Sequence, residues 1–220
     1  MTAACAFRFW DDPTLTELAV RITAIAGAEV RVDQTIFYAQ SGGQESDHGT
    51  LGGIDVIDAR KQAHADGTPG IVYTLATAPT WQVGETVTMR IDGARRHRLM
   101  RLHFAAEVVL ELVYRACAGI EKIGAHIGPD KARIDFLWPQ TLAPLLPAVQ
   151  AQAMAIIDAD QPIVSAFSDA ATLRRYWEVE GFARVPCGGT HLKRTGEVGT
   201  IALKRKNVGG GKERVEITLV

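Results

Sequence analysis

Two side chains able to bind a metal ion stand four positions apart near the C-terminal end of the chain. Cys187 and His191 lie in segment 186–191, which reads Pro-Cys-Gly-Gly-Thr-His, so two glycines loosen the turn between them. Thiolate sulfur and imidazole nitrogen are ligands that zinc prefers, usually four of them in a tetrahedral arrangement. Two ligands do not make a site, so the others must come from elsewhere in the sequence.

The best partners are His103 and Glu107. Apolar residues recur at helical spacing between positions 99 and 117, which predicts an amphipathic helix. Side chains four positions apart share one face of a helix, so both can point at one spot beside the core. Taken alone, His103 is typical of a boundary histidine and Glu107 of a solvated side chain, like Glu111 one turn later. The Cys-x-x-x-His segment is what favours a metal pair.

Three other segments carry motifs. Residues 37–44 read Phe-Tyr-Ala-Gln-Ser-Gly-Gly-Gln, residues 131–136 read Lys-Ala-Arg-Ile-Asp-Phe, and residues 212–217 read Lys-Glu-Arg-Val-Glu-Ile. Together with the two halves of the metal motif, they follow the order found in freestanding alanyl-tRNA editing proteins of the AlaX type. That family is related to the editing domain of alanyl-tRNA synthetase. The chain resembles it from about residue 30 to the C-terminus, although Ala39 stands where the family usually has proline.

The resemblance implies one zinc ion, Zn²⁺, held by His103, Glu107, Cys187 and His191. In the family the second helix position is a histidine, and here it is Glu107. A carboxylate is an acceptable zinc ligand. With two neutral histidines, one thiolate and one carboxylate, the ligand charges cancel the charge of the zinc dication. We therefore expect the zinc to be a weaker Lewis acid than it would be with three histidines and a thiolate. We predict ligation by Glu107. The alternatives are a general base beside the metal and loss of the metal altogether.

The Ser-Gly-Gly-Gln run implies a substrate pocket. By resemblance, Ser41, Gly42, Gly43 and Gln44 line the pocket for the amino acid, and Thr35 supplies a hydroxyl that distinguishes side chains. Adjacent glycines permit positive φ and close approach to a ligand, while Gln44 offers both a donor and an acceptor. A β-turn followed by a strand is the simpler interpretation of the same residues.

The charge balance excludes a globally basic nucleic-acid-binding protein, because 24 Lys and Arg face 25 Asp and Glu, for a net charge of −1. Contact with tRNA would depend on local clusters at the start of the motif helix and around the final hairpin. A solvated face is the alternative for any of them. The predicted tRNA contacts are Arg96, Arg98, Arg101, Lys204, Arg205, Lys206, Lys212 and Arg214.

The cysteine usage indicates a reducing cytoplasm, since three cysteines are too few and odd in number for a disulfide scaffold. We find no signal-peptide pattern and no apolar run long enough to span a membrane. We therefore expect a cytoplasmic protein that does not contact a membrane.

The pattern of elements predicts an α+β fold in two parts. Residues 1–92 should form a small antiparallel β-barrel-like domain that carries the Ser-Gly-Gly-Gln segment, and residues 93–220 an α+β editing domain with the metal site. Asp92 should cap the motif helix and Gly119 should end it. The elements expected after that helix are strands 120–127 and 132–137, a helix from 139 or 141 to 158, strand 162–167, a short helix through Tyr176, and a hairpin that turns at 209–211.

The resemblance implies a trans-editing hydrolase that uses zinc to remove serine or glycine from mischarged alanine tRNA, with no obligatory protein partner. An alanine-sized site cannot strongly reject glycine by size, so a second, hydrolytic site supplies the discrimination. One alternative is a catalytically silent tRNA- or protein-binding module with the same fold. Another is a threonyl-type editing hydrolase, which the Ser-Gly-Gly-Gln run disfavours. A zinc peptidase is disfavoured because Phe104, not Glu, follows the first histidine.

Overall fold

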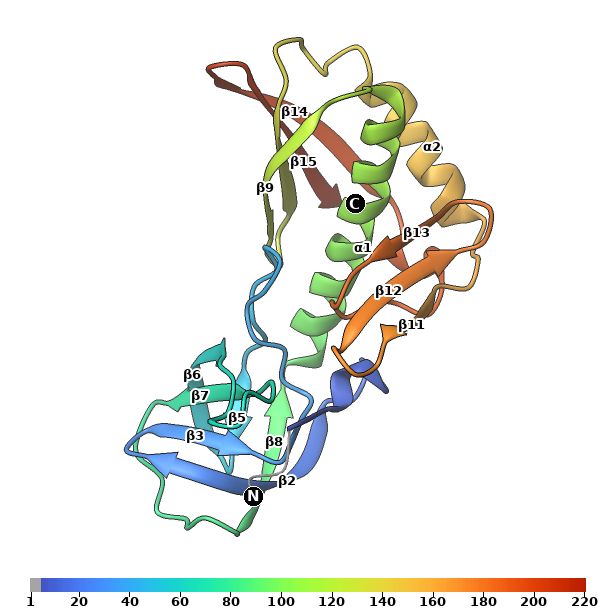
Figure 1. Ribbon diagram of the computed structural model, residues 1–220. Coiled ribbons are helices and arrows are strands. Elements are labelled where there is room, and N and C mark those ends of the chain that lie inside the picture. The colour runs from blue at the N-terminus through green and yellow to red at the C-terminus, as the bar shows by residue number, and fades with distance from the viewer. Residues whose placement is uncertain (1–4) are drawn as a thin grey trace. The chain divides into compact units, whose positions relative to one another are not determined.

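A computed structural model describes residues 5–220 and shows an α+β protein made of two compact units (Figure 1). One unit comprises the chain up to Ser41 together with Glu45–His97, and the other comprises Gly42–Gln44 with Arg98–Val220. Helix α1 (Gly93–Ala116) therefore begins in the first unit and continues through the second. Each unit has its own hydrophobic core.

The first unit is a closed antiparallel barrel, as the alternating pattern predicts. In its longest strand, Val20 and Ile22 are buried while the residues between and beside them are not. The buried residues include Phe37, Tyr73 and Met89. A short pair, β1 (Ala6–Phe7) and β4 (Gln34–Thr35), lies outside the barrel. In barrel order the strands are β2 (Glu17–Ala26), β3 (Glu29–Val32), β7 (Ile71–Leu75), β6 (Ile54–Lys61), β5 (Gly49–Leu51) and β8 (Thr86–Ile91).

The second unit contains two antiparallel sheets and most of the helical residues. The four-stranded sheet has the order β14 (Ile201–Gly209), β15 (Lys212–Leu219), β10 (Ala132–Leu137), β9 (Glu121–Ile127). The three-stranded sheet has the order β11 (Val164–Asp169), β12 (Arg174–Val179), β13 (Ala183–Pro186). The remaining elements are α1, α2 (Leu146–Asp158) and the short 3₁₀ helix η2 (Thr195–Val198).

Helix α1 runs through the core of the second unit. Between Leu99 and Val109 it is buried on almost every side, more than a single amphipathic stripe would require. Such burial is typical of a helix that packs against several elements. The ring of Phe104, the residue after His103, packs edge-on against the ring of Trp177 in β12, with 5.1 Å between the ring centroids. This contact holds the part of the helix that carries the metal motif against β12.

The ends of the motif helix follow the sequence prediction. The Asp92 Oδ1 atom accepts a hydrogen bond from the Arg95 backbone N–H at 3.0 Å, as an N-cap does. Past the last helical residue, Gly119 adopts a φ of +84°, which favours glycine.

Two expected elements differ from the structure. The second helix begins at Leu146, later than expected, because residues 139–145 form turns in which the Leu142 N–H bonds to Glu213. The expected short helix through Tyr176 is wrong, because that segment is strand β12. Arg175, Trp177 and Val179 are buried at every second position, which is a strand period. Among the described residues, no helix is long and apolar enough to cross a membrane.

Candidate metal centre

Four side chains with metal-binding atoms converge in the second unit. Helix α1 presents His103 and Glu107 one turn apart, and the loop after β13 presents Cys187 and His191. One potential ligand atom from each lies within 4.8 Å of the others. Within residues 5–220 this is the only such group of three or more. The structure thus brings together the four residues that the sequence predicts as metal ligands.

The spacing of the ligand atoms fits a tetrahedral zinc ion. The His103 Nε2 atom lies 3.3 Å from Cys187 Sγ and 3.3 Å from Glu107 Oε2, and the same Glu107 oxygen lies 3.3 Å from His191 Nε2. Zinc–ligand bonds of about 2.0–2.3 Å separate the corners of a tetrahedron by about 3.3–3.8 Å. At these three separations the Glu107 carboxylate lies where a fourth ligand of such an ion would bind.

Unpartnered polar atoms point to the same conclusion. Glu107 Oε2 and His191 Nε2 are both buried and lie 3.3 Å apart, but within residues 5–220 neither atom has a partner in regular hydrogen-bond geometry. Leaving such atoms unpaired inside a protein costs about 1–3 kcal/mol each, so they are rare unless something else satisfies them. Two nitrogens, one sulfur and one carboxylate oxygen are an acceptable zinc donor set. The residues present fit the metal.

The four side chains shift one another's pKa values toward the charged forms. Burial disfavours the imidazolium of His103, but the Glu107 carboxylate and the Cys187 sulfur outweigh it, so the pKa of His103 lies well above its ordinary value. Burial likewise opposes protonation of His191, but the nearby Cys187 sulfur and Glu107 carboxylate raise its pKa overall. The metal must therefore compete with protons at both imidazoles.

The two anionic ligands are shifted in the opposite direction. Burial alone would raise the pKa of Glu107, but His103 and then His191 hold that pKa below the usual range. For Cys187, burial and the Glu107 charge raise the pKa, while the adjacent imidazoles of His103 and His191 lower it overall. The Gly189 backbone N–H also points to the Cys187 sulfur at 3.4 Å. These contacts favour the thiolate and carboxylate that a metal requires.

The ligand loop lies close against the helix. The Cys187 N–H bonds to the Arg175 carbonyl at 2.9 Å, which anchors the loop to β12. A Cβ atom on Gly189 would lie 2.7 Å from His103 Nε2 and 3.4 Å from Cys187 Sγ. Position 189 must therefore be glycine if the two halves of the centre are to meet.

A small cavity borders the metal cluster. Its volume is about 140 Å³, roughly five times the share of one molecule in liquid water. His103 and Glu107 form part of its wall, and Gly42, Glu111 and Lys122 line it as well. The cavity is therefore large enough for a small organic group and offers charges of both signs.

The glycines of the Ser-Gly-Gly-Gln run lie along β9 in the second unit. Gly43 accepts a hydrogen bond from the Ile127 N–H at 2.8 Å, and Gln44 forms a bridge with the same residue. Gly43 has a φ of +88°, and a Cβ there would lie 2.6 Å from the carbonyl oxygen of Ala125, so glycine is required. The Gln44 side chain is fully buried, and among the residues that the structure describes neither its nitrogen nor its oxygen has a hydrogen-bond partner.

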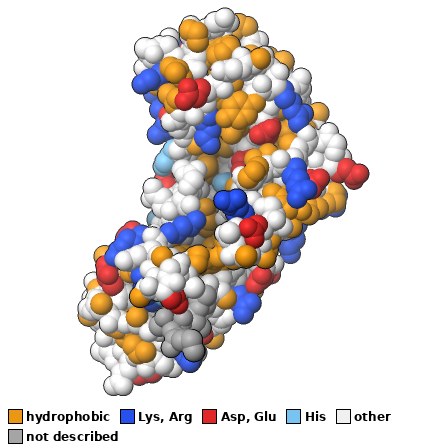
Figure 2. Space-filling view, viewed as in Figure 1, with side chains coloured by type: hydrophobic (Ala, Val, Ile, Leu, Met, Phe, Trp, Pro, Cys, Tyr) orange, Lys and Arg blue, Asp and Glu red, His pale blue; other side chains and the backbone are white. Residues whose placement is uncertain are grey.

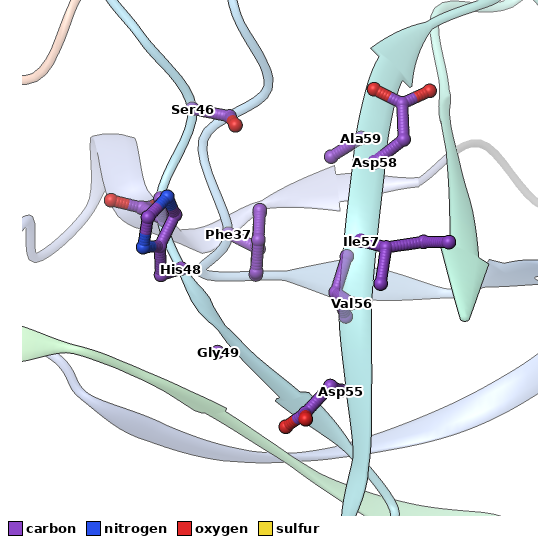
Figure 3. A pocket seen from close by; sticks show the side chains of 10 residues that line it. Phe37, Ser46, His48, Gly49, Asp55, Val56, Ile57, Asp58 and Ala59 are labelled. Atoms are coloured by element: carbon purple, nitrogen blue, oxygen red, sulfur yellow. The ribbon is translucent and has the colours of Figure 1, made fainter. Parts of the chain in front are cut away.

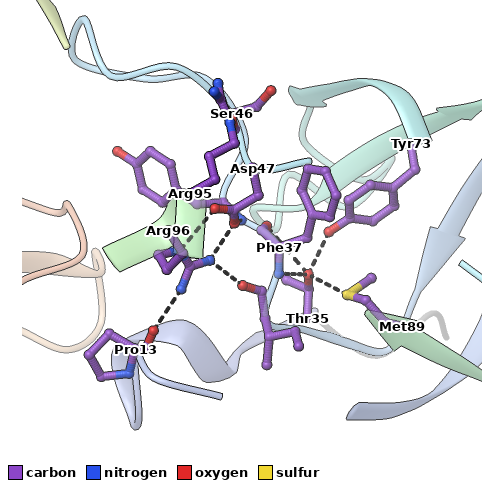
Figure 4. Close-up of polar contacts among 11 residues, drawn as sticks. Pro13, Thr35, Phe37, Ser46, Asp47, Tyr73, Met89, Arg95 and Arg96 are labelled. Carbon is purple, nitrogen blue, oxygen red and sulfur yellow. Dashed lines mark hydrogen bonds and ion pairs between the residues drawn. The ribbon is translucent and has the colours of Figure 1, made fainter. Parts of the chain in front are cut away.

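Ser41 and Thr35 belong to the first unit. The Ser41 hydroxyl accepts a hydrogen bond from Lys61 Nζ at 2.8 Å. Thr35 is fully buried in the barrel core, where its hydroxyl lies 2.6 Å from the Tyr73 hydroxyl and 2.9 Å from the Phe37 N–H (Figure 4). These contacts give Thr35 a structural role, and its predicted role in substrate selection stays a prediction.

Arg96, one of the predicted tRNA contacts, is 2% exposed and forms an ion pair with Asp47, which is also 2% exposed (Figure 4). Its Nε donates to Asp47 Oδ1 at 2.9 Å, and its other nitrogens donate to the carbonyls of Pro13 and Ile36. The guanidinium is thus committed to the first unit, where it joins the start of α1 to the loop around Asp47.

Two further arginines of the predicted set also have carboxylate partners. Arg205 and Glu213 form a two-bond pair at 2.7 and 2.5 Å, and Arg214 and Asp135 form one at 2.5 and 3.0 Å. Each pair spans neighbouring strands of the four-stranded sheet. Their charges are largely neutralised within the sheet.

The other predicted tRNA contacts are more available to a ligand. Arg98 donates to the Pro129 carbonyl at 3.0 Å, and Arg101 donates to the Val198 carbonyl at 2.8 Å, so neither has its charge cancelled by these bonds. On the face drawn in Figure 2, basic and acidic side chains are interspersed. Exposed lysines of the final hairpin complete the set: Lys204, Lys206 and Lys212.

Three residues near the centre were not singled out from the sequence. Glu111 follows Glu107 by one turn and lines the 140 Å³ cavity, so helical spacing was the signal that could have found it. Lys122 lines the same cavity from β9. Ser165 of β11 places its hydroxyl 3.2 Å from His191 Nδ1. No motif marks Ser165, because only the strand pairing brings it to the histidine.

A larger hollow of about 400 Å³ lies in the barrel unit, beside β6 (Figure 3). Asp55 and Asp58 of β6 line it, and His48 lines it from the segment before β5. These residues are not part of the group of potential metal ligands found in residues 5–220.

A protein-family model described as the threonyl and alanyl tRNA synthetase second additional domain matches residues 178–216. That stretch contains Cys187 and His191, the second half of the metal cluster.

Whole-chain comparisons extend the similarity to both units. The chain is 32% identical over 216 residues to the alanyl-tRNA editing protein AlaX-M of Pyrococcus horikoshii, covering 96% of each protein. It is 29% identical to the alanine–tRNA ligase of Methanopyrus kandleri and 34% identical to that of Bordetella petrii. It covers 25% of the length of each ligase. With 32% identity over nearly its full length, the chain belongs to the family of alanyl-tRNA editing proteins.

Proposed function

We propose that the chain is a trans-acting editing hydrolase. It cleaves the ester bond between a wrongly attached amino acid and the 3′ end of alanine tRNA, with serine or glycine as the misattached residue, in the cytoplasm. The names of its relatives, an alanyl-tRNA editing protein and alanine–tRNA ligases, support this substrate class. The observation that carries the proposal is the four-residue cluster at the wall of a 140 Å³ cavity.

The cluster would hold one zinc ion through His103, Glu107, Cys187 and His191. Zinc bound there would act as a Lewis acid toward the ester carbonyl or toward a water molecule. The chain itself supplies the ligand geometry, because α1 and the anchored loop fix the four donor atoms before any ion arrives. The Glu107 oxygen that faces both imidazoles supports ligation. Action of Glu107 as a base is the alternative.

The cavity would select the amino acid by size. Its small volume suits a residue such as glycine or serine and excludes large side chains. Gly42 in its wall lets the backbone approach the substrate closely. Gln44, two residues after Gly42, would orient the bound group if its buried amide turns toward the cavity, since within residues 5–220 neither of its polar atoms has a partner. Discrimination by size alone is worth about 1–3 kcal/mol per methylene, so glycine and serine are both accepted.

The tRNA would contact Lys204, Lys206 and Lys212 of the final hairpin, with Arg98 and Arg101 as further phosphate partners. Within residues 5–220, these side chains are the members of the predicted set that form no ion pair with a carboxylate, unlike Arg96, Arg205 and Arg214. Substituting one hairpin lysine by Ala should weaken tRNA binding equally for cognate and mischarged tRNA. It should also reduce the salt dependence of binding by about one released ion. Binding measured at several salt concentrations tests this.

The central experiment replaces Cys187 with Ala and measures hydrolysis of seryl-, glycyl-, alanyl- and threonyl-tRNA. We expect the wild type to hydrolyse seryl- or glycyl-tRNA(Ala) and Cys187→Ala to lose more than about 100-fold in rate together with its zinc. Cys117→Ala, at the other partly buried cysteine, is the matched control and should keep both. Unchanged hydrolysis by Cys187→Ala would remove the metal from the mechanism.

A second pair of variants separates the two roles of Glu107. If Glu107 is a ligand, Glu107→Gln should lose zinc affinity, while Glu107→His should keep it. A Glu107→Gln protein that holds its zinc and loses turnover would show instead that the carboxylate acts as a base. A wild-type protein that binds tRNA, contains no zinc and hydrolyses no ester would favour the silent binding module.

A further inference from the structure

We propose that Ser165 is a positioning residue for the metal centre: its hydroxyl fixes the ring orientation and tautomer of His191. The inference rests on the proposed metal-dependent function. The Ser165 Oγ atom lies 3.2 Å from His191 Nδ1, on the side of the ring opposite the Nε2 atom that faces Glu107. His191 is 5% exposed, so few other groups can reach this nitrogen.

The strand register explains why Ser165 points to the centre. In the three-stranded sheet, Ser165 of β11 pairs with Trp177 of β12. Directly paired residues of antiparallel strands share one face of a sheet. Trp177 is fully buried on that face and meets Phe104, the neighbour of His103 on α1. The hydroxyl of Ser165 is therefore directed to the side of the sheet that carries the metal ligands.

A metal-binding imidazole is usually held by such a partner. To bind a metal through Nε2, His191 must be neutral and carry its proton on Nδ1, where the Ser165 oxygen can accept it. When Nε2 carries the proton instead, the hydroxyl can turn and donate to Nδ1. Ser165 can thus stay bonded to His191 before and after a metal displaces the proton.

The two histidines of the centre differ in this respect. The Nδ1 atom of His103 is buried and, among the described residues, has no hydrogen-bond partner. Packing against Trp177 through its neighbour Phe104 is what restrains that helix position. His191 lies on a loop that contains two glycines, so its ring depends more on a side-chain hydrogen bond. Removing the Ser165 hydroxyl should therefore loosen one ligand without disturbing the helix.

The test compares three variants by zinc affinity, measured by competition with a chelator. Ser165→Ala should bind zinc about 10–100-fold more weakly than the wild type, as is usual when a hydrogen-bond partner of a ligating histidine is removed. Ser165→Thr keeps a hydroxyl and should recover most of the affinity. Ser168→Ala is the matched control, because this β11 hydroxyl bonds to the Arg174 carbonyl and should leave affinity unchanged.

Two controls keep the outcome decisive. The melting temperatures of the metal-free variants should match the wild type, since Ser165 is an exposed residue whose truncation leaves no cavity. Nitrogen-detected NMR of the zinc-loaded wild type should show His191 protonated at Nδ1. Wild-type zinc affinity in Ser165→Ala would overturn the inference and leave the proposed hydrolase standing. A wild-type protein that binds no zinc would overturn the metal centre and this inference together.

Discussion

At the scale of single residues, the metal cluster depends on how closely its two halves approach. Gly189 is the clearest example, because the space where its side chain would be is filled by the His103 ring and the Cys187 sulfur. Gly189 has no side chain that could bind the metal. Its small size nevertheless allows α1 and the loop after β13 to place their ligands around one ion.

We predict that Gly189→Ala weakens zinc binding strongly. The added methyl group would meet His103 Nε2 at 2.7 Å, a distance that real Cβ atoms do not tolerate, so the ring or the loop must move. The expected loss of zinc affinity is at least about 10-fold. Gly124→Ala is a suitable control, because a Cβ there meets only ordinary contacts with Asp135, the nearest at 3.5 Å. Equal zinc affinity in the two variants would contradict the geometry of the centre.

The protonation of the ligands gives a second prediction at this scale. In the metal-free folded chain the pKa values of His103 and His191 are raised, so zinc must displace protons from them. Apparent zinc affinity should therefore continue to rise above pH 6.5, the ordinary imidazole value, by up to about tenfold per pH unit for each proton displaced. Chelator competition at pH 6, 7 and 8 measures this, and a flat profile would contradict it.

The same pKa shifts determine how the two imidazoles make the stability of the metal-free protein depend on pH. Because the folded pKa values of both imidazoles exceed the unfolded one, their contribution to stability is complete below about pH 6.5 and is lost as the pH rises through the folded values. The contribution of the two imidazoles to the stability of the metal-free protein should thus fall over the pH range in which zinc binds more tightly. Zinc and protons replace one another at the same nitrogens.

At the scale of elements, the first turn of α1 is held to the barrel by the buried pair of Arg96 and Asp47. Asp47 Oδ2 also accepts the Tyr38 N–H at 2.6 Å, so one carboxylate connects the helix with the chain before the Ser-Gly-Gly-Gln run. This pair is typical of buried charges that are fully hydrogen-bonded.

We predict that Asp47→Asn lowers the free energy of unfolding by about 3–5 kcal/mol, because it leaves the Arg96 guanidinium buried without its counter-charge. Urea unfolding measures the change. Glu17→Gln breaks an exposed pair with Arg90 and serves as the control, with an expected cost below about 1 kcal/mol. Similar costs for the two variants would show that the Arg96 pair is not the buried contact described.

Sequence patterns predicted most elements because those elements have a regular period. The barrel strands, β9, β10 and the final hairpin follow their apolar alternation, and the motif helix follows its cap at Asp92. β12 was missed as a strand because its alternation is short and includes a buried arginine, Arg175, which lies over the Phe167 ring. Pairing with β11 and β13 makes this segment a strand, and the local propensity of its residues does not predict that pairing.

The predicted metal residues came together because each has a local signature, either helical spacing or a glycine-loosened turn. Residues without such a signature could not be found in this way. Ser165 reaches His191 only through the pairing of β11 with β12, and Lys122 reaches the cavity wall only through the position of β9. Arg96 was predicted to contact phosphate because the sequence of an arginine-rich segment does not show which of its arginines is buried.

At the scale of the whole molecule, the metal would act as a cross-link within the second unit. His103 and Cys187 are 84 positions apart in the chain. An ion that binds only the folded state adds stability that depends on its concentration, about 4 kcal/mol at 1,000 times the dissociation constant.

We predict that removing zinc with a chelator lowers the melting temperature of the wild type but not that of Cys187→Ala. The reason is that only the wild type has the full ligand set and thus loses binding energy on chelation. Differential scanning calorimetry with and without chelator measures the shift. An equal shift in both proteins would mean that the chelator acts elsewhere than at this cluster.

The residues Gly42–Gln44 belong to the second unit although the chain on both sides of them belongs to the first. An excised fragment that starts at Gly93 would retain every metal ligand but would lack Gly42 from the cavity wall and the amide of Gln44. Such a fragment should still capture zinc while losing selectivity among aminoacyl esters. Division of the chain at the helix would thus separate ion retention from editing.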